Sequence, residues 1–394
     1  MRRVNYRAIQ SSAPVTPTFH GPPHITVGNE TAGDTLANCD YLDPGNGDEL
    51  RNALQQAYSD GGGTVYARRG TYSIADSPLP VRNNVHLVGE GPGATVIAAA
   101  TTAFGDLVEL RGENMSVRDL SVMLVDGAEV EGTAAMYAIN GCINALIDNV
   151  SFNATLGTET SGKVYACIRI GATPTNRNIR VSRCSFYATT SDTFDYDNVS
   201  ACIVTACTEG INANSPDSLF VSECYFRSNT GSPSNNCGVM VGGGVVSITG
   251  CAFDKHGHAA VMAAPRFGLI DGLVCNGNTA IFGNGKEGIY IFQPDDSSFP
   301  IEGITIHNNV VRAHPSGSLN EAIVVRNTSN TQDILYPSLV GNYCDTLGTG
   351  IGVYIDEGGA AQINRTLIDS NQLRENSNPI IDTGTTTITG TNVT

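Results

Sequence analysis

The sequence contains no tryptophan, and only 15% of its 394 residues are charged. Flat aromatic platforms are common in polysaccharide clefts, so the absence of tryptophan counts against a processive polysaccharide enzyme. Basic residues are scarce as well: 22 Lys and Arg stand against 38 Asp and Glu, which gives a net charge of −16. Nucleic acid is therefore not expected as a partner, because phosphate binding needs a basic surface. A uronate-rich polysaccharide would also be repelled, outside a local basic cleft.

Long apolar runs are missing too. No stretch approaches the ~18 apolar residues of a membrane span, and residues 1–10 lack the apolar core of a secretory signal. The eleven cysteines show no short spacing that resembles a zinc site. We therefore expect no membrane, metal or cofactor. We interpret the cysteines as buried, reduced thiols of a protein that folds in a cytoplasm.

The sequence does contain a hexapeptide motif that recurs at intervals of 22 to 40 residues. Its form is apolar, two variable residues, then Cys, Asn or an apolar residue, one variable residue, and a last apolar residue. The nine copies begin at Val117, Ile147, Val181, Val221, Ile248, Ile270, Ile306, Leu339 and Ile368. A fixed motif on such a period is typical of a solenoid, in which each unit buries its apolar face against its neighbours.

The residue types indicate which solenoid this is. Val, Ile, Phe and Cys in short runs broken by Gly, Asn, Ser and Asp favour strands. A second strand is predicted in several units, at residues 164–170, 237–241, 288–292, 322–326 and 352–356. Two or three strands per coil, all wound the same way, predict an all-β fold: a single-stranded, right-handed parallel β-helix.

In such a stack, equivalent residues of successive coils lie about 4.8 Å apart and form ladders. The sixth motif position predicts a stack of aromatic rings, and the fourth predicts a thiol ladder that gives way to an amide ladder. Stacked interior Asn side chains can satisfy buried backbone groups of the turns. The predicted stacks are Phe152, Phe186, Phe226 and Phe253, and Cys184, Cys224, Cys251, Leu273, Asn309, Asn342 and Asn371.

Composition divides the chain into three parts. Residues 1–30 are Pro-rich, carry Arg2, Arg3 and Arg7, and are expected to be an extended arm; the alternative is a floppy tail. Residues 31–98 lead into the β-helix and contain one clear helix at 48–59, with Asp48 as a plausible N-cap, which can plug the open end of the stack. The first strand of the stack is expected at residues 64–67. Residues 99–394 form the remaining coils.

Several segments of the second part carry a resemblance to a known family. They are Asn38-Cys-Asp40-Tyr, residues 47–57, Gly61-Gly-Gly-Thr-Val65, Gly70-Thr-Tyr72 and residues 85–97. Together they resemble the opening segment of the pectin-lyase-like superfamily, and are most similar to its branch of phage tailspikes and other virion-associated β-helices. The resemblance implies a β-helix fold, and it leaves the activity open because the superfamily contains lyases, hydrolases, epimerases and non-enzymatic adhesins.

The catalytic motifs of the enzymes in this superfamily are not found. Of the polygalacturonase pattern only His256-Gly257 and Asp295-Asp296 are present, in the wrong chain order. The calcium and arginine motifs of pectate lyases and the Asp-Pro-His-Glu of alginate epimerases are absent. These absences disfavour an enzyme without excluding a phage depolymerase with its own kind of site.

Three places carry chemistry-bearing residues. The loop with Asp192, Asp195, Tyr196 and Asp197 can bind a cation or a sugar, or be a solvated loop or subunit contact. In the predicted second strands, Glu287 aligns with Glu321 and can form an acid–base pair, while Arg326 aligns with Asp356 and can form a surface ion pair. The third place is a mixed-charge turn followed by Arg266; its titratable residues are Asp254, His256 and His258.

These observations favour a virion-associated structural or adhesive protein, a capsid decoration or tailspike-like fibre. We expect a homotrimer, because closed cyclic symmetry hides a long lateral face. Residues 1–30 would dock it onto capsid or tail proteins, and host surface glycans are possible ligands. The protein would be made in the host cytoplasm and act at the virion surface. The alternative is a polysaccharide-degrading enzyme, a lyase or glycoside hydrolase of the phage depolymerase type.

Overall fold

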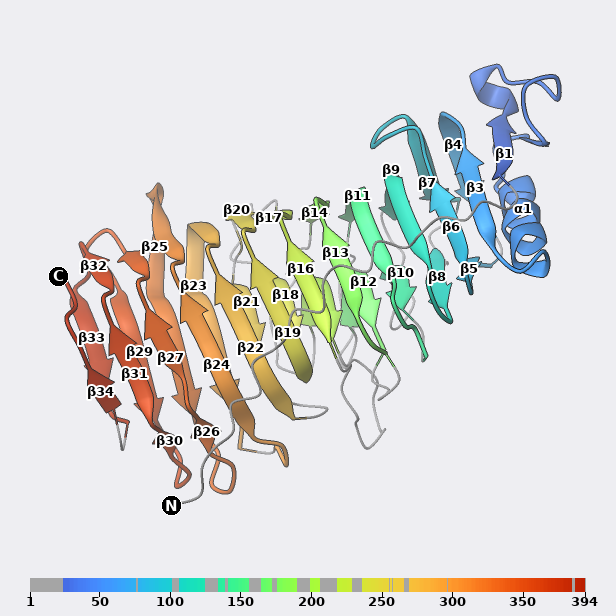
Figure 1. The fold of residues 1–394 in the computed structure, drawn as a ribbon. Helices are drawn as coiled ribbons and strands as arrows, with labels where there is room; N and C mark the ends of the chain where they lie inside the picture. The colour runs from blue at the N-terminus through green and yellow to red at the C-terminus, as the bar shows by residue number, and fades with distance from the viewer. Residues whose placement is uncertain are drawn as a thin grey trace.

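The computed structural model describes residues 24–75, 77–100, 106–124, 134–138, 141–155, 164–171, 176–189, 199–205, 218–228, 236–254, 256, 258–265, 269–295, 297–384 and 387–393. Its strands pair in parallel with the strands of the coils before and after (Figure 1). Three strands per coil build three walls, here called A, B and C, and confirm the predicted right-handed parallel β-helix.

Each wall is a stack of in-register strands. Wall A contains β3 (Gly63–Ala67), β6 (Val85–Val88), β9 (Ser116–Leu124), β11 (Leu146–Thr155), β13 (Ile179–Ser182), β16 (Leu219–Ser222), β19 (Gly244–Thr249), β22 (Ile270–Asn276), β24 (Ile301–His307), β26 (Ile334–Leu335), β27 (Ser338–Val340), β30 (Ile363–Asn364), β31 (Thr366–Asp369) and β34 (Thr387–Thr389). Wall B contains β4 (Gly70–Ile74), β7 (Thr95–Ala99), the second halves of β9 and β11, β14 (Ser185–Thr189), β17 (Tyr225–Ser228), β20 (Ala252–Asp254), the beginnings of β23 (Thr279–Gln293) and β25 (Val310–Asn327), β28 (Tyr343–Asp345) and β32 (Gln372–Arg374). Wall C contains β5 (Leu79–Arg82), β8 (Val108–Arg111), β10 (Ala134–Ala138), β12 (Val164–Ile170), β15 (Val199–Thr205), β18 (Asn236–Val241), β21 (Ala259–Ala263), the ends of β23 and β25, β29 (Ile351–Glu357) and β33 (Asn378–Asp382).

One end of the stack is covered by the helix α1 (Asp48–Ser59), as predicted (Figure 1). Its apolar stripe of Leu50, Ala53, Leu54 and Ala57 is buried against the first strands. The N-cap is Gly47, not Asp48, and the capping acceptor comes from further back in the chain. The buried carboxylate of Asp43 accepts hydrogen bonds from the backbone N–H groups of Gly45, Gly47 and Leu50.

The stack begins earlier than the sequence suggested. β1 (His24–Asn29) pairs with β3 and with β2 (Tyr41–Asp43), and the short 3-10 helix η1 (Glu30–Ala32) follows it. The predicted first strand at 64–67 is therefore preceded by another, and residues 24–30, which the sequence assigned to the arm, belong to β1 and η1. Short alternating runs such as His-Ile-Thr-Val-Gly-Asn are easily overlooked next to a Pro-rich segment.

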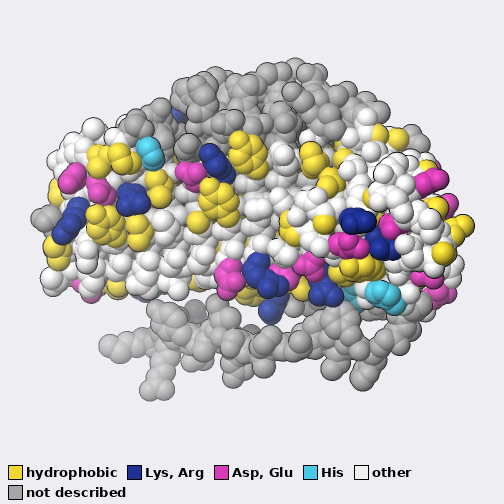
Figure 2. All heavy atoms as spheres, turned by 90° about the horizontal axis from the view of Figure 1, so that it is seen from above, with side chains coloured by type: hydrophobic (Ala, Val, Ile, Leu, Met, Phe, Trp, Pro, Cys, Tyr) yellow, Lys and Arg dark blue, Asp and Glu magenta, His cyan; other side chains and the backbone are white. Residues whose placement is uncertain are grey.

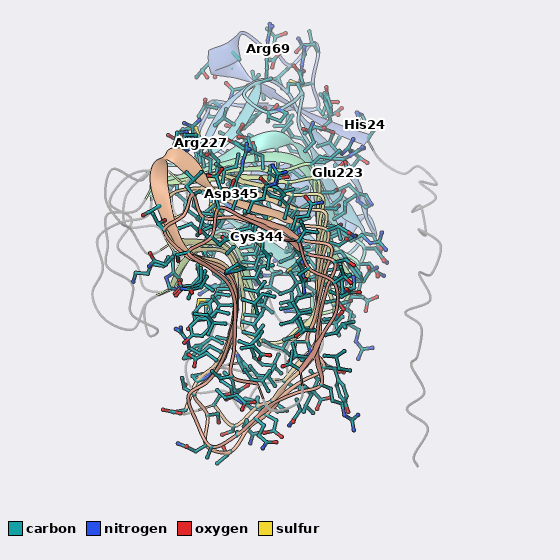
Figure 3. The ribbon with its side chains drawn as sticks, turned by 90° about the vertical axis from the view of Figure 1, so that its left-hand side faces the viewer. His24, Arg69, Glu223, Arg227, Cys344 and Asp345 are labelled. Carbon is teal, nitrogen blue, oxygen red and sulfur yellow. The ribbon has the colours of Figure 1, made fainter. Side chains whose placement is uncertain are left out.

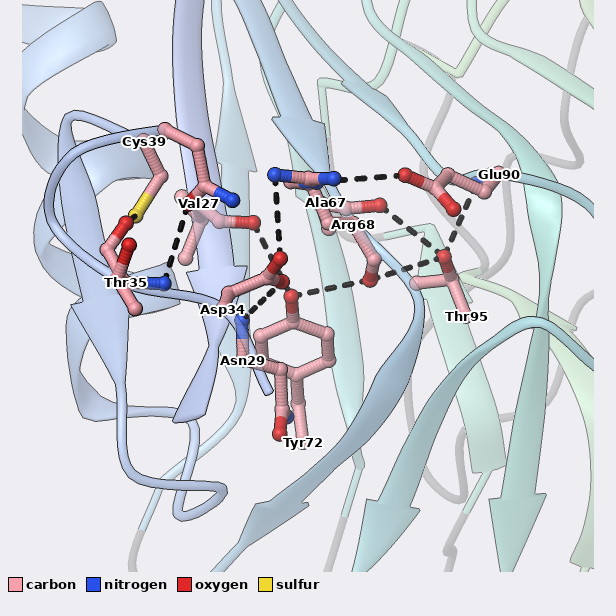
Figure 4. A network of polar contacts seen from close by, with 11 residues as sticks. Val27, Asn29, Asp34, Thr35, Cys39, Ala67, Arg68, Tyr72, Glu90 and Thr95 are labelled. Carbon is pink, nitrogen blue, oxygen red and sulfur yellow. Dashed lines mark hydrogen bonds and ion pairs between the residues drawn. The ribbon is translucent and has the colours of Figure 1, made fainter. Parts of the chain in front are cut away.

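A polar network ties this first coil to the next two (Figure 4). The hydroxyl of the fully buried Tyr72 donates to the carbonyl oxygens of Val27 and Arg68, at 3.2 and 3.0 Å. The Arg68 side chain pairs with Asp34 at 3.1 Å and with Glu90 at 3.6 Å. The network holds β1 and the segment after η1 in place, and we assign it a structural role.

The predicted ring stack is confirmed. Neighbouring centroids in the series Phe152, Phe186, Phe226 and Phe253 are 4.9, 4.6 and 4.7 Å apart, with interplanar angles of 3°, 4° and 6°. These separations match the spacing of strands in a sheet. Every cysteine in the described part of the chain is a free thiol, and all but Cys39 are buried. In that same part, no helix is long and apolar enough to cross a membrane.

The amide ladder is confirmed with one correction of register. Leu273 pairs with Val246 and Ile304, whereas Cys275 pairs with Ile248 and Ile306. The sixth copy of the motif therefore begins at Cys275, and its fourth position is an asparagine. With this register the two neighbouring intervals become 27 and 31 residues, in place of 22 and 36. The sequence pattern failed here because Ile270, Leu273 and Cys275 imitate the motif on the same wall.

The corrected ladder consists of Asn278, Asn309, Asn342, Asn371 and Asn392. Each of the first four donates its side-chain amide to a backbone carbonyl of the previous coil and to the side-chain oxygen of the next Asn. That oxygen also accepts the backbone N–H of the Asn before it, as from Asn309 to Asn342 at 3.0 Å. The ladder satisfies polar backbone groups inside the turn between walls A and B.

Candidate functional site

The outer face of wall C carries the densest group of titratable and aromatic side chains among the candidates. Four successive coils, those of β21, β23, β25 and β29, bring these side chains together. We call this group the carboxylate site; it consists of His258, Glu287, Tyr290, Glu321, Arg326, Tyr354 and Asp356.

The pairing of strands places the two glutamates side by side, as predicted. Glu287 on β23 is the register partner of Glu321 on β25. The next residue, Gly288, lies so close to the following coil that a Cβ would sit 2.3 Å from the carbonyl oxygen of Ala322. The close approach of the two coils next to Glu287 therefore requires a glycine.

Burial and charge raise the pKa values of both carboxyl groups. Glu287 is 9% exposed, and burial together with the charge of Glu321 raises its pKa to about 7, against the lowering effect of Lys286 and Arg326. Burial also raises the pKa of Glu321, while Arg326 opposes that rise. The pair can therefore hold a proton near neutral pH, and Glu287, the more deeply buried of the two, is the group favoured to carry it.

His258 lies behind the pair. Its Nδ1 is 3.5 Å from Oε2 of Glu287, and its ring meets the ring of Tyr290 edge-on at 5.9 Å between centroids. Burial lowers the pKa of His258 to about 3. Since the pKa of Glu287 is about 7, both groups are neutral between these two pH values, and their contact is not an ion pair.

The predicted partnership of Arg326 and Asp356 is also confirmed. They are register partners on β25 and β29, and Nε of Arg326 donates to Oδ2 of Asp356 at 2.8 Å. The guanidinium lies over the rings of Tyr290 and Tyr354, 5.8 and 5.4 Å from their centroids. Its side chain is 26% exposed, so this pair is more enclosed than a solvated surface pair.

The third predicted cluster is not brought together. Asp254 lies on wall B, where it accepts from the Tyr225 hydroxyl at 3.2 Å. His256 is buried with its ring edge against Phe253 of the core, and burial lowers its pKa to about 4. His258 alone joins the carboxylate site. A coil corner separates the three because the chain turns from wall B to wall C between Asp254 and Ala259.

Other predicted residues lie outside the described part of the chain. They are Arg2, Arg3, Arg7, Asp192, Asp195, Tyr196, Asp197 and Arg266. Within the described residues, no group of three or more His, Cys, Asp or Glu side chains is arranged to hold a metal ion.

Two features of wall C were missed by sequence reasoning. Tyr290 and Tyr354 complete the carboxylate site, and the alternation in their strands would have placed both on the outer face. Further along the wall, Arg169 pairs with Asp106 at 3.0 Å and stacks on the ring of Tyr137 at 4.0 Å. Burial raises the pKa of Asp106 to about 6. Nothing in the sequence around Asp106 signals this contact, which joins residues 63 positions apart.

The fold has solved counterparts. The tailspike protein of E. coli bacteriophage HK620 in complex with a pentasaccharide superposes with a TM-score of 0.55, at 14% identity, over 87% of this chain and 61% of that chain. A doubly substituted form of the same tailspike, also with pentasaccharide, gives a TM-score of 0.60 with the same identity and coverage. This chain therefore has the right-handed parallel β-helix fold of a phage tailspike, and it spans about three fifths of that protein's length.

Comparison by sequence finds similarity over a much shorter part of the chain than comparison by structure. A stretch of 88 residues, 20% of this chain, is 34% identical to mannuronan C5-epimerase AlgE2 of Azotobacter vinelandii and covers 9% of it. No protein-family model matches the sequence. The predicted resemblance is thus confirmed for the fold, and the activity has to be argued from the residues.

Proposed function

We propose that this chain is a virion-associated β-helix protein that binds glycans of the host surface. The observation that carries the proposal is the carboxylate site, a largely enclosed group of carboxyl, guanidinium and aromatic side chains built from four successive coils of one wall. Such a site offers hydrogen-bond acceptors, donors and ring faces at fixed separations, which suits the hydroxyl groups and apolar faces of sugars. The likeness of the fold to a tailspike solved with a pentasaccharide supports the same function.

In this proposal the protein is a homotrimer at the virion surface, made in the host cytoplasm. Residues 1–23 dock it onto capsid or tail proteins, and the walls of the β-helix remain available to the glycan. Closed cyclic symmetry suits a long prism because it hides one lateral face of each copy.

The paired glutamates favour a second candidate, a glycoside hydrolase. In-register side chains on adjacent strands start about 4.8 Å apart, near the roughly 5 Å between the carboxyl groups of retaining glycosidases. In that reaction Glu287 would give its proton to the glycosidic oxygen while Glu321 attacks the anomeric carbon. The glycosyl ester formed on Glu321 would then be hydrolysed by a water that Glu287 deprotonates. The raised pKa of Glu287, about 7, suits the acid of such a pair.

Epimerisation is not carried over from the sequence match, because the chain lacks the Asp-Pro-His-Glu of alginate epimerases.

Turnover and binding assays distinguish the two candidates. The full chain is incubated with bacterial capsular and pectin-type polymers, and reducing ends and the absorbance of unsaturated products are followed. A purely adhesive protein retains polymer on a column and releases no ends. Release of reducing ends that Glu287→Gln and Glu321→Gln both abolish would establish the hydrolase, and unsaturated products would indicate a lyase. Absence of both binding and turnover on all polymers would reject the glycan proposal.

A further inference from the structure

The outer face of wall B carries two exposed rows of side chains, two residues apart along each strand. Figure 2 looks onto this face from above and shows hydrophobic, basic and acidic side chains along it. One row runs through Ser185, Tyr225, Ala252, Thr279, Val310, Tyr343 and Gln372. The other runs through Tyr187, Arg227, Asp254, Ile281, Arg312, Asp345 and Arg374. All of these side chains are exposed or half-buried.

The first group on this face surrounds Tyr225. This ring is 42% exposed, and its hydroxyl donates to Oδ2 of Asp254 at 3.2 Å. Arg227 lies 3.6 Å from the same oxygen and 5.9 Å from the ring centre of Tyr187, which is 37% exposed. Two accessible rings, a carboxylate and a guanidinium thus meet on a flat surface, and none of the four belongs to the core.

A second group repeats these residue types further along the wall. The hydroxyl of Tyr343 donates to Oδ2 of Asp345 at 3.4 Å, and the register partners of Asp345 on either side are Arg312 and Arg374. In the view down the axis, Arg227 and Asp345 lie at the same outer edge of the prism, with Cys344 turned inward (Figure 3). Tyr225 and Tyr343 share one row and are four coils apart, which at about 4.8 Å per coil is ~19 Å.

We propose that the outer face of wall B is an extended binding surface for an uncharged, linear oligosaccharide that runs along the axis of the β-helix. Tyrosine rings in each group pack against the apolar faces of sugar rings, and each Arg–Asp pair offers a donor and an acceptor to neighbouring hydroxyl groups. The charges on the row nearly balance, with Arg227, Arg312 and Arg374 against Asp254 and Asp345. This balance and the net charge of −16 disfavour an acidic polymer.

This inference rests on the proposed function and adds to it a ligand class and a second surface, apart from the carboxylate site. The test measures binding of the full chain to an array of uncharged and uronate-bearing oligosaccharides from bacterial surfaces. We expect uncharged oligosaccharides to bind, and Tyr225→Ala and Tyr343→Ala each to weaken that binding about tenfold or more. Tyr225→Phe keeps the ring and should lose less.

Tyr58→Ala is the matched control. Tyr58 is 38% exposed and carries the guanidinium of Arg82 over its ring at 5.0 Å, but it lies on α1, away from wall B. This variant should bind like the parent protein.

Four results would overturn the proposal for wall B. Binding that falls in Glu287→Gln or Glu321→Gln but not in the tyrosine variants would leave the proposed function standing and reject this surface. If a tyrosine variant loses binding and also changes its oligomeric mass, wall B is an interface between copies of the chain and not the glycan surface. A parent protein that binds only uronate-bearing oligosaccharides would reject the ligand class, and one that binds nothing would reject the proposed function as well.

Discussion

Glu287 and Glu321 are register partners on adjacent coils, and the charge of Glu321 helps burial to raise the pKa of Glu287 to about 7. Two carboxyl groups held this way share a proton near neutral pH, because ionising both places like charges side by side. The titratable and charged groups around the pair are His258, which precedes β21, Lys286 on the same strand as Glu287, and Arg326 on the same strand as Glu321.

Replacing Glu321 by Gln should lower the pKa of Glu287. The variant removes the neighbouring negative charge and leaves the burial of Glu287, which is the larger cause, so the pKa should remain above its ordinary value of 4.5. The measurement is an NMR titration of the carboxyl carbons. Glu109→Gln, on a distant coil of wall C, should leave the titration of Glu287 where it was. An unchanged or higher pKa in Glu321→Gln would contradict the coupling.

Glu287 should make the protein less stable as pH rises. Its folded-state pKa of about 7 exceeds the ordinary 4.5, so the folded protein binds more protons than the unfolded chain between these values. The free energy of unfolding contributed by this group therefore falls from pH 4.5 to 7. Glu287→Gln lacks this titration. Its free energy of unfolding, relative to that of the parent protein, should therefore be higher at pH 8 than at pH 4 by on the order of 2–3 kcal/mol.

Urea unfolding of both proteins at the two pH values checks this. His258 has the opposite pH dependence. Burial lowers its pKa to about 3, so below pH 6.5 the unfolded chain binds more protons than the folded protein, and the free energy of unfolding contributed by His258 falls as the pH falls. It is present in both proteins, so the difference between them isolates Glu287. A difference that is equal at pH 4 and pH 8 would show that the carboxyl group titrates normally.

Breaking the amide ladder at Asn309 should be costly. Its Nδ2 donates to the carbonyl of Cys275 and to Asn342, and its oxygen accepts from the backbone and side chain of Asn278. Asn309→Ala leaves several buried polar groups without partners, at about 1–3 kcal/mol each. We expect a loss of several kcal/mol in thermal or denaturant unfolding. Asn308→Gly removes an exposed amide at a positive φ of 55°, which glycine tolerates, and should change stability little.

Deleting residues 1–23 should separate docking from folding. The described coils begin with β1 at His24, so the shortened chain should keep the circular dichroism spectrum and the oligomeric mass of the full chain. We expect it to lose binding to virus particles that lack the protein, in a co-sedimentation assay with the full chain as control. Undiminished sedimentation of the shortened chain would reject a docking role for the arm.

The sequence predicted the fold well because its signal is repeated in every coil. The Phe152–Phe253 stack, the thiol ladder and the helix over residues 48–59 all follow from local residue types and spacing. The alignment of Glu287 with Glu321, and of Arg326 with Asp356, followed from the same repeat, since strands that share a core pattern also share a register.

What the sequence could not predict depends on contacts between distant coils. Asn278 was missed because the motif also fits if it begins at Ile270, which puts Leu273 at the fourth position. Only the pairing of Cys275 with Ile248 shows that the motif begins at Cys275. Asp43 caps α1 from outside the helix, so no local capping signal reveals it. The separation of His256 from His258 likewise depends on which way the chain turns at a coil corner, and a sequence this short carries no periodic signal.

Register along the prism has one more consequence. Because the inward side chains of wall B pack in the core and its outward rows do not, those outward rows can change one residue at a time without disturbing the scaffold. Ligand specificity can then change through surface substitutions while the core stays the same, and two proteins with the same interior can come to recognise unrelated polymers.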